Sequence, residues 1–189
     1  KYRDINGDGV VDDNDCTIIG NGLPVHTGGF TNNFAYAGFD LSVFFQWSYG
    51  NDILNANRLW FESSWNKSRD LNQFASYADR WTPENPTSDI PRATASASNK
   101  VFSSRIIEDG SFLRLKTVTL GYTLPKAIVT RLHIDNLRVY FAAQNLFTIT
   151  SYSGYDPEVS IRDNALTPGL DFSAYPRARQ FSFGLHIGF

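Results

Sequence analysis

The sequence has few charged residues and almost no sulfur. Its 189 residues include one cysteine, no methionine and only 19% charged side chains, with a formal net charge of −2. The lone Cys16 excludes an internal disulfide, and the absence of any Lys or Arg cluster argues against a nucleic-acid partner. No run approaches the roughly 18–20 apolar residues of a membrane-spanning helix. The N-terminus lacks a secretory signal pattern and suggests a C-terminal piece of a longer protein.

The usual catalytic motifs are missing as well. There is no GxSxG, no HExxH and no phosphate-binding glycine loop. The three histidines fall in a predicted loop, turn and strand, without metal-ligand spacing among them: His26, His133 and His186. Two carboxylate pairs, Glu108 with Asp109 and Asp156 with Glu158, are interpreted as charges that order loops rather than as a hydrolytic pair. The sequence therefore predicts a protein that is not an enzyme.

Aromatic residues, by contrast, are abundant, at 15% of the chain, and this favours strands over helices. From Phe39 to Tyr49 every odd position is apolar or aromatic and most even positions are small or polar, which is the two-residue period of a strand. Ala37 and Gly38 predict a tight hairpin turn before it. Antiparallel strands are predicted at residues 28–36, 39–50, 112–124, 137–147 and 178–189.

Two of these strands carry further information. In the strand at 112–124, Arg114 and Lys116 would interrupt the apolar face of the second half. Either a β-bulge at this point, or a first half whose face lies outside the apolar layer, would explain why the two halves of the strand differ in pattern. The last strand alternates small or polar residues with five apolar ones: Phe181, Phe183, Leu185, Ile187 and Phe189.

The connections between strands are very unequal in length. Residues 51–111 and 148–177 are long predicted loops, whereas the other links are short. This asymmetry is typical of a transmembrane β-barrel and uncommon in compact domains. A soluble antiparallel sandwich shows the same alternation, but the polar faces here carry Ser, Gly, Thr and Gln rather than Lys and Glu. The predicted fold is all-β, an antiparallel transmembrane barrel. A final strand that ends in the periplasm would place both long loops and residues 1–27 outside the cell.

The stretch DINGDGVVDDND at residues 4–15 has the spacing of an EF-hand-like calcium loop. Gly9 permits the sharp turn, and six residues offer oxygen ligands at fixed positions: Asp4, Asn6, Asp8, Val10 through its carbonyl, Asp12 and Asp15. Asp15 departs from the motif, which has a longer Glu at that position. A solvated Asp- and Asn-rich turn without metal is the alternative. We expect a structural Ca²⁺ that stabilises the loop.

Several of these segments together resemble the C-terminal end of SusC/RagA-type TonB-dependent transporters. They are DINGDGVVDDND, EDGSFLRLKTVTLGYTLP, NLF followed by GYDPE, and the closing YPRARQFSFGLHIGF. The resemblance covers nearly the whole chain, with residues 66–100 the least characteristic.

The resemblance implies a barrel of 22 strands in the outer membrane of a Gram-negative bacterium, in contact with membrane lipid. It implies an N-terminal plug in the lumen, a SusD-like surface lipoprotein over the mouth, and import of glycans or peptides powered by the TonB complex. The plug and the TonB-contacting segment have no counterpart in this sequence. The five apolar residues of the terminal strand, up to Phe189, would be the signal for barrel assembly.

An alternative function remains open. The chain would also suit a calcium-stapled secreted β-sheet adhesin or glycan-binding module. Four rings in the 51–111 segment are candidates for stacking on a substrate, or for packing the loop against itself: Trp60, Trp65, Tyr77 and Trp81.

Overall fold

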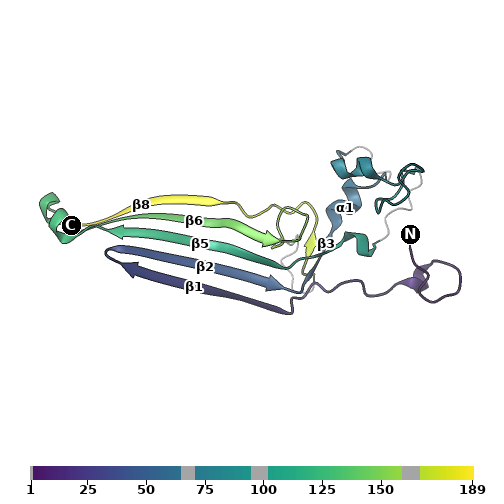
Figure 1. Ribbon diagram of the computed structural model, residues 1–189, viewed down its shortest axis with the longest axis horizontal. Helices are drawn as coiled ribbons and strands as arrows, with labels where there is room; N and C mark the ends of the chain where they lie inside the picture. Colours follow the sequence, from purple (N-terminus) through teal and green to yellow (C-terminus); the bar gives the residue numbers. More distant parts are fainter. Residues whose placement is uncertain (1, 65–70, 95–101, 159–166) are drawn as a thin grey trace.

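Five long strands form one antiparallel sheet in the order β1-β2-β5-β6-β8 (Figure 1). The computed structural model describes residues 2–64, 71–94, 102–158 and 167–189. The strands are β1 (His26–Tyr36), β2 (Phe39–Tyr49), β5 (Phe112–Thr123), β6 (Asn136–Thr150) and β8 (Gln180–Gly188). Both bounds of each predicted strand lie within two residues of the observed bounds, except for the strand that corresponds to β6. That strand continues to Thr150, three residues into the predicted loop.

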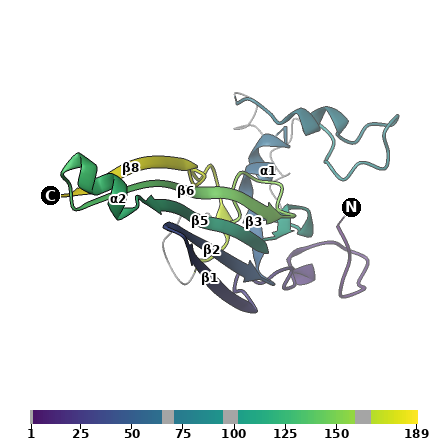
Figure 2. The ribbon, with the colours of Figure 1, turned by 60° about the vertical axis from the view of Figure 1, so that its left-hand side comes forward.

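Short links join neighbouring strands at one end of the sheet. Ala37 and Gly38 turn β1 into β2 with φ angles of 49° and 86°, the left-handed pair of a type I′ hairpin. Between β5 and β6 the chain forms α2 (Lys126–Val129) and η5 (Thr130–Leu132). The C-terminus lies at this same end (Figures 1 and 2).

Strand register separates the sheet into an apolar face and a polar face. Phe30 lies opposite Phe45 with ring centroids 4.8 Å apart, and Phe141 lies 4.9 Å from Phe183. These residues share one face because partners across an antiparallel ladder point the same way. The apolar face is most exposed on the two edge strands, where Phe34 is 60% exposed and Leu185 66%, whereas Leu115 and Ala143 of the inner strands are buried. No second layer of described elements covers the large side chains of the edge strands.

The predicted irregularity near Lys116 is a β-bulge. The pairing of β2 with β5 shifts between Phe44 and Phe45, and Leu115 and Thr117 pair with consecutive residues of β2. Lys116 is the extra residue, so the face that holds Leu115 continues at Val118. Arg114 consequently lies on the polar face. On β6 the same irregularity leaves Asn145 with a φ of 52°. Beyond the bulge, the alternation of apolar and polar residues continues, and Phe147 and Ile149 lie on the apolar face opposite Leu115 and Leu113. β6 is therefore longer than predicted.

Large side chains on one strand cover glycines on the next. A Cβ at Gly184 would lie 2.3 Å from the Tyr140 ring, and one at Gly28 would lie 2.4 Å from the Trp47 ring. Each glycine faces its partner directly in the register. These rings lie flat across the neighbouring strand because no side chain stands in their way.

The segments predicted as long loops contain short elements of regular structure. A small sheet in the order β4-β3-β7 is built from β3 (Asp52–Asn55), β4 (Ile107–Asp109) and β7 (Leu170–Asp171). Beside it lie α1 (Ala56–Phe61), η2 (Ala75–Asp79) and η4 (Ser104–Ile106). Ile53 and Ile106 are fully buried here. Elements of two to six residues are too short to show a periodicity in the sequence.

This small sheet and α1 lie at the end of the long sheet opposite the C-terminus, and the acidic N-terminal loop with its 3-10 turn η1 (Asp13–Asp15) extends beyond them (Figures 1 and 2). We call this end the loop end. Among the described residues, no helix is long and apolar enough to cross a membrane.

Candidate functional site

The acidic loop is folded around its own carboxylates. Asp4 accepts hydrogen bonds from the backbone N–H of Gly7 at 2.6 Å and of Gly9 at 2.8 Å. Asp15 accepts from Ile5 at 2.7 Å and from Asp12 at 2.9 Å, which closes the loop from its far end. Gly7 and Gly9 have φ angles of 79° and 84°, which glycine adopts without strain. The motif therefore forms a closed turn.

The predicted calcium ligands all belong to this turn. The backbone N–H groups of Ile5 and Asp12 stabilise the ionised form of Asp15 and lower its pKa. Asp8 accepts from Val10, and Asp12 accepts from Asn14. Carboxylate, amide and carbonyl oxygens are the donor set that Ca²⁺ prefers. Within residues 2–64, 71–94, 102–158 and 167–189, however, no group of three or more Asp, Glu, His or Cys side chains is arranged to hold a metal ion. Calcium binding stays a prediction.

The segment after the acidic loop is anchored to the small sheet. The backbone N–H of Asp52 donates to the Asn21 carbonyl at 2.8 Å, and the Asn21 N–H donates to the Asp52 carboxylate at 2.8 Å. The Val25 N–H donates to the Tyr49 carbonyl. The acidic loop is therefore attached at the loop end, beside the start of β1.

The terminal strand β8 forms one edge of the long sheet. Its side chains at the predicted barrel-assembly positions are 45% to 91% exposed, and four of them face residues of β6 across the apolar face: Phe181, Phe183, Leu185 and Ile187, with Phe189 just beyond the strand. The structure brings the four strand residues onto one face at a free edge.

Two groups of ion pairs hold the segments of the loop end together. Glu62, only 4% exposed, pairs with Arg58 at 3.0 Å and with Arg105 at 2.6 Å. Glu108 accepts from Arg58 at 3.2 Å and from the Ser153 N–H at 2.9 Å. The role of Glu108 as a loop-ordering charge agrees with the sequence-based interpretation. Sequence reasoning missed Arg58, Glu62 and Arg105.

The second group holds the segment after β6 on the polar face of β5. Arg114 pairs with Asp156, and both are at least 97% buried. Lys116 pairs with Glu158 at 2.8 Å. Burial opposes ionisation of Asp156, but hydrogen bonds from Arg114 and from the backbone N–H of Arg177 outweigh it and lower its pKa. Arg114 and Lys116 are two residues apart, and so are Asp156 and Glu158. This matched spacing is the sequence signal that could have predicted the pairing.

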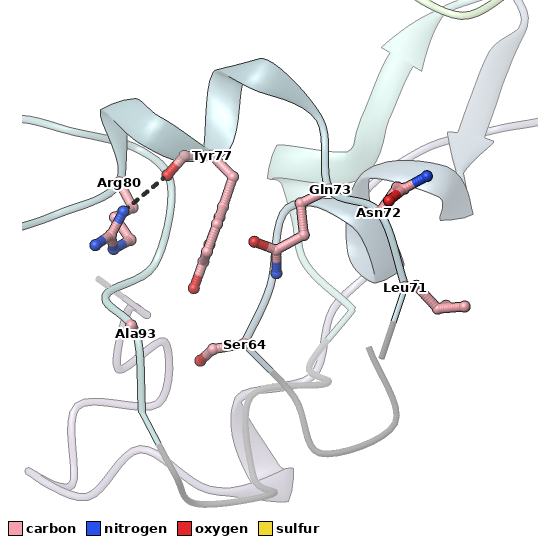
Figure 3. Close-up of a pocket in the computed structure, with 7 residues that line it drawn as sticks. All are labelled: Ser64, Leu71, Asn72, Gln73, Tyr77, Arg80 and Ala93. Atoms are coloured by element: carbon pink, nitrogen blue, oxygen red, sulfur yellow. Dashed lines mark hydrogen bonds between the residues drawn. The ribbon is translucent and has the colours of Figure 1, made fainter. Parts of the chain in front are cut away.

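The four candidate rings of the 51–111 segment have different surroundings. Trp60 packs against Phe172 with centroids 5.6 Å apart. Tyr77 is 7% exposed and points into a cavity of about 510 Å³ (Figure 3), and its hydroxyl has no hydrogen-bond partner among the described residues. Trp81 is 37% exposed, and Trp65 lies outside the described residues. Trp60 and Tyr77 thus pack the loop end, and a substrate role for any of the rings stays a prediction.

The histidines and the cysteine belong to different elements of the fold. His26 is the first residue of β1 rather than part of a loop, and its Nδ1 accepts from Trp47 Nε1 at 3.1 Å. His133 occupies a left-handed turn with a φ of 57°, and His186 lies opposite Arg138 on the polar face. Cys16 is exposed.

Known proteins resemble this chain in both sequence and fold. The TonB-dependent receptor P3 of Formosa agariphila is 36% identical over 193 residues, which cover all of this chain and 19% of the receptor. The TonB-dependent receptor SusC of Bacteroides thetaiotaomicron is 28% identical over 189 residues, which cover all of this chain and 17% of SusC. No protein-family model matches the chain.

Among solved structures, the RagAB peptide importer in its 'closed-closed' state matches 96% of this chain and 20% of the matched chain, with a TM-score of 0.75 and 28% identity. The chain therefore spans about a fifth of the length of the relatives it matches. The agreement in sequence over the full chain and in fold confirms the resemblance: the chain belongs to the SusC-type TonB-dependent transporters.

Proposed function

We propose that the chain forms strands of an outer-membrane barrel in a Gram-negative bacterium, as part of a TonB-dependent importer. The exposed apolar face of the five-stranded sheet carries this proposal. Contiguous apolar surfaces of this extent mark interaction sites or lipid contact. The face bears Phe34 at 60%, Phe183 at 82% and Leu185 at 66% exposure, whereas a secreted sandwich module would cover such a face. The adhesin alternative is therefore disfavoured.

Strand dimensions support a lipid-facing sheet. β2 has 11 residues, which at about 3.4 Å per residue and a tilt of about 45° span about 25 Å, the height of the apolar band of such barrels. Rings gather at both ends of the band, with Tyr36 and Phe39 at one end and Trp47 and Tyr49 at the other. Interfacial aromatic girdles have this arrangement.

The edges of the sheet support a larger closed structure. Neither β1 nor β8 has a second partner strand among the residues that the structure describes. Unpaired backbone groups in lipid cost several kcal/mol each, so only closed barrels are stable there. Further strands of the 22-stranded barrel would pair with both edges, and the polar face would line the lumen around the plug.

The family supports the remaining parts of the proposal. We infer import of glycans or peptides with a SusD-like surface lipoprotein, driven by the TonB complex; the RagAB relative is a peptide importer. The loop end would face outside, where the lipoprotein docks. Fractionation of cells that express the full-length transporter, with heat-modifiable gel mobility as the readout, tests the barrel. A protein that is folded and monomeric without detergent would contradict it.

We also propose that Ca²⁺ stabilises the acidic loop as a structural ion. The spacing of the motif and the closed turn, in which Asp4, Asp8 and Asp15 each accept a backbone hydrogen bond, support this proposal, and extracellular sites of this type need only bind at about 10⁻⁴ to 10⁻³ M. Protease nicking of residues 1–27 should increase with a chelator in the wild type. In Asp8→Ala, nicking of residues 1–27 should be high with and without the chelator, whereas the barrel strands should stay resistant to the protease. Equal nicking of the wild type with and without chelator would contradict calcium binding.

A further inference from the structure

A second cavity, of about 450 Å³, lies between α1 and the segment that follows β6. Its walls come from α1 with the residues on either side of it, Asn55 and Glu62, from the short segment at residues 74–76, and from residues 153–155. Three parts of the chain that are far apart in sequence thus meet around one space at the loop end. Neither the acidic loop nor the apolar face contributes to it.

The charges at this cavity cancel. The Arg58 guanidinium pairs with Glu62 at 3.0 Å and with Glu108 at 3.2 Å, and Arg105 pairs with Glu62 at 2.6 Å. Two guanidinium groups therefore balance two carboxylates. An anionic or cationic ligand would find no unpaired opposite charge in this network, and it would lose its own hydration on entry. The cavity therefore suits a neutral ligand.

Its polar groups still offer hydrogen bonds. Asn57 uses its side-chain oxygen to accept from the Ser173 N–H at 2.7 Å, while its amide nitrogen makes no hydrogen bond with any described residue. The Ser76 hydroxyl donates to Glu62 at 2.8 Å, and its oxygen can still accept. A free donor and a free acceptor in one cavity match a ligand hydroxyl, which both donates and accepts.

Aromatic rings complete the cavity. Phe74 belongs to the wall, and Tyr155 lies at the opening with 77% of its surface exposed. The backbone on either side of Tyr155 is fixed, because Ser153 donates to Glu108 and Asp156 pairs with Arg114. An exposed ring on an anchored backbone loses little entropy when it packs against a ligand.

We propose that this cavity is a binding subsite for a neutral saccharide ring, with hydroxyls on Asn57 and Ser76 and an apolar face on Tyr155. The assignment rests on the proposed function, in which the loop end of an importer faces outside, the side from which the substrate arrives. A saccharide fits better than a peptide because a peptide brings charged termini and is often held by a free strand edge. The cavity wall presents side chains from α1 and two loop segments instead.

Saturation-transfer NMR and calorimetry on the detergent-purified full-length transporter test this subsite. The probes are maltohexaose, xylohexaose and laminarihexaose, with hexaglycine as the peptide. We expect at least one hexasaccharide to bind to the wild type. Tyr155→Ala should weaken the affinity for that hexasaccharide about tenfold. Asn57→Asp, which keeps the acceptor for Ser173 but removes the donor, should weaken the affinity as well. Tyr175→Ala is the matched control, because Tyr175 is an exposed ring that does not line the cavity, and should leave binding unchanged.

Three results would overturn the subsite: no hexasaccharide binds, binding is the same in Tyr155→Ala as in the wild type, or only hexaglycine binds. Heat-modifiable mobility of every variant separates this failure from failure of the proposed function. A transporter that inserts as a barrel yet binds no saccharide would refute the subsite alone. A wild type without barrel mobility would refute the proposed function.

Discussion

A charge at Phe183 should destabilise the protein in lipid far more than the same charge at its neighbour Ser182. Phe183 lies near the middle of β8 on the apolar face, and its ring is 4.9 Å from that of Phe141. An Arg on the lipid face costs about 2–4 kcal/mol near the bilayer midplane, and loss of the ring pair adds about 0.5–1.5 kcal/mol. Phe183→Arg should therefore cost about 2.5–5.5 kcal/mol in total.

Ser182→Arg is the matched control. Ser182 lies opposite Ala142 on the polar face and is exposed, so an Arg there should cost within about 1 kcal/mol. The assay is urea unfolding of the full-length transporter in lipid vesicles, followed by heat-modifiable mobility. Equal losses for the two variants, or a stable Phe183→Arg, would refute the assignment of the apolar face to lipid.

Three further predictions concern the loop end and the sheet. Asp156→Asn removes one carboxylate partner of the buried Arg114, which then keeps Glu158 at 3.1 Å as its ion-pair partner among the described residues, so the segment after β6 should lose about 1–3 kcal/mol of local stability and become open to limited proteolysis; resistance equal to the wild type would contradict a role of Asp156 in holding this segment. Because the folded pKa of Asp156 is lowered, its contribution is complete above the unfolded value of about 3.9 and is lost as the pH falls through the folded pKa, so nicking in the wild type should rise only at acidic pH. Gly184→Ala meets the Tyr140 ring and should cost about 1–3 kcal/mol in urea unfolding; Tyr140→Ser in the same chain should restore most of the loss, and additive losses would argue against the contact.

Three of the long strands, β2, β6 and β8, could be predicted from the sequence because they keep a two-residue period over seven or more residues. That period is visible from Phe39 to Tyr49 and from Phe181 to Ile187, where one face is apolar throughout. The bulge at Lys116 was also predictable as one of two options, since Arg114 interrupts the pattern and a one-residue slip restores it. Local alternation carries this information without any knowledge of distant contacts.

The loop end could not be predicted in the same way. Its strands have two to four residues, and its stability depends on pairs such as Arg105 with Glu62 and Tyr152 with Asp171, which are far apart in sequence. No local period signals such contacts. For the same reason the cavity beside α1 has no counterpart in the sequence-based predictions, although Tyr155 was visible within GYDPE.

Accessibility of single cysteines along β8 tests the central claim most directly. In the full-length transporter with other cysteines removed, spin labels at positions 181–187 would be measured in lipid vesicles for collision with oxygen, which partitions into lipid, and with a water-soluble nickel chelate. The account predicts high oxygen collision at 181, 183, 185 and 187 and low oxygen collision at 182, 184 and 186, following the faces that the register defines. Uniform access to the nickel chelate at all seven positions would contradict a lipid-facing sheet.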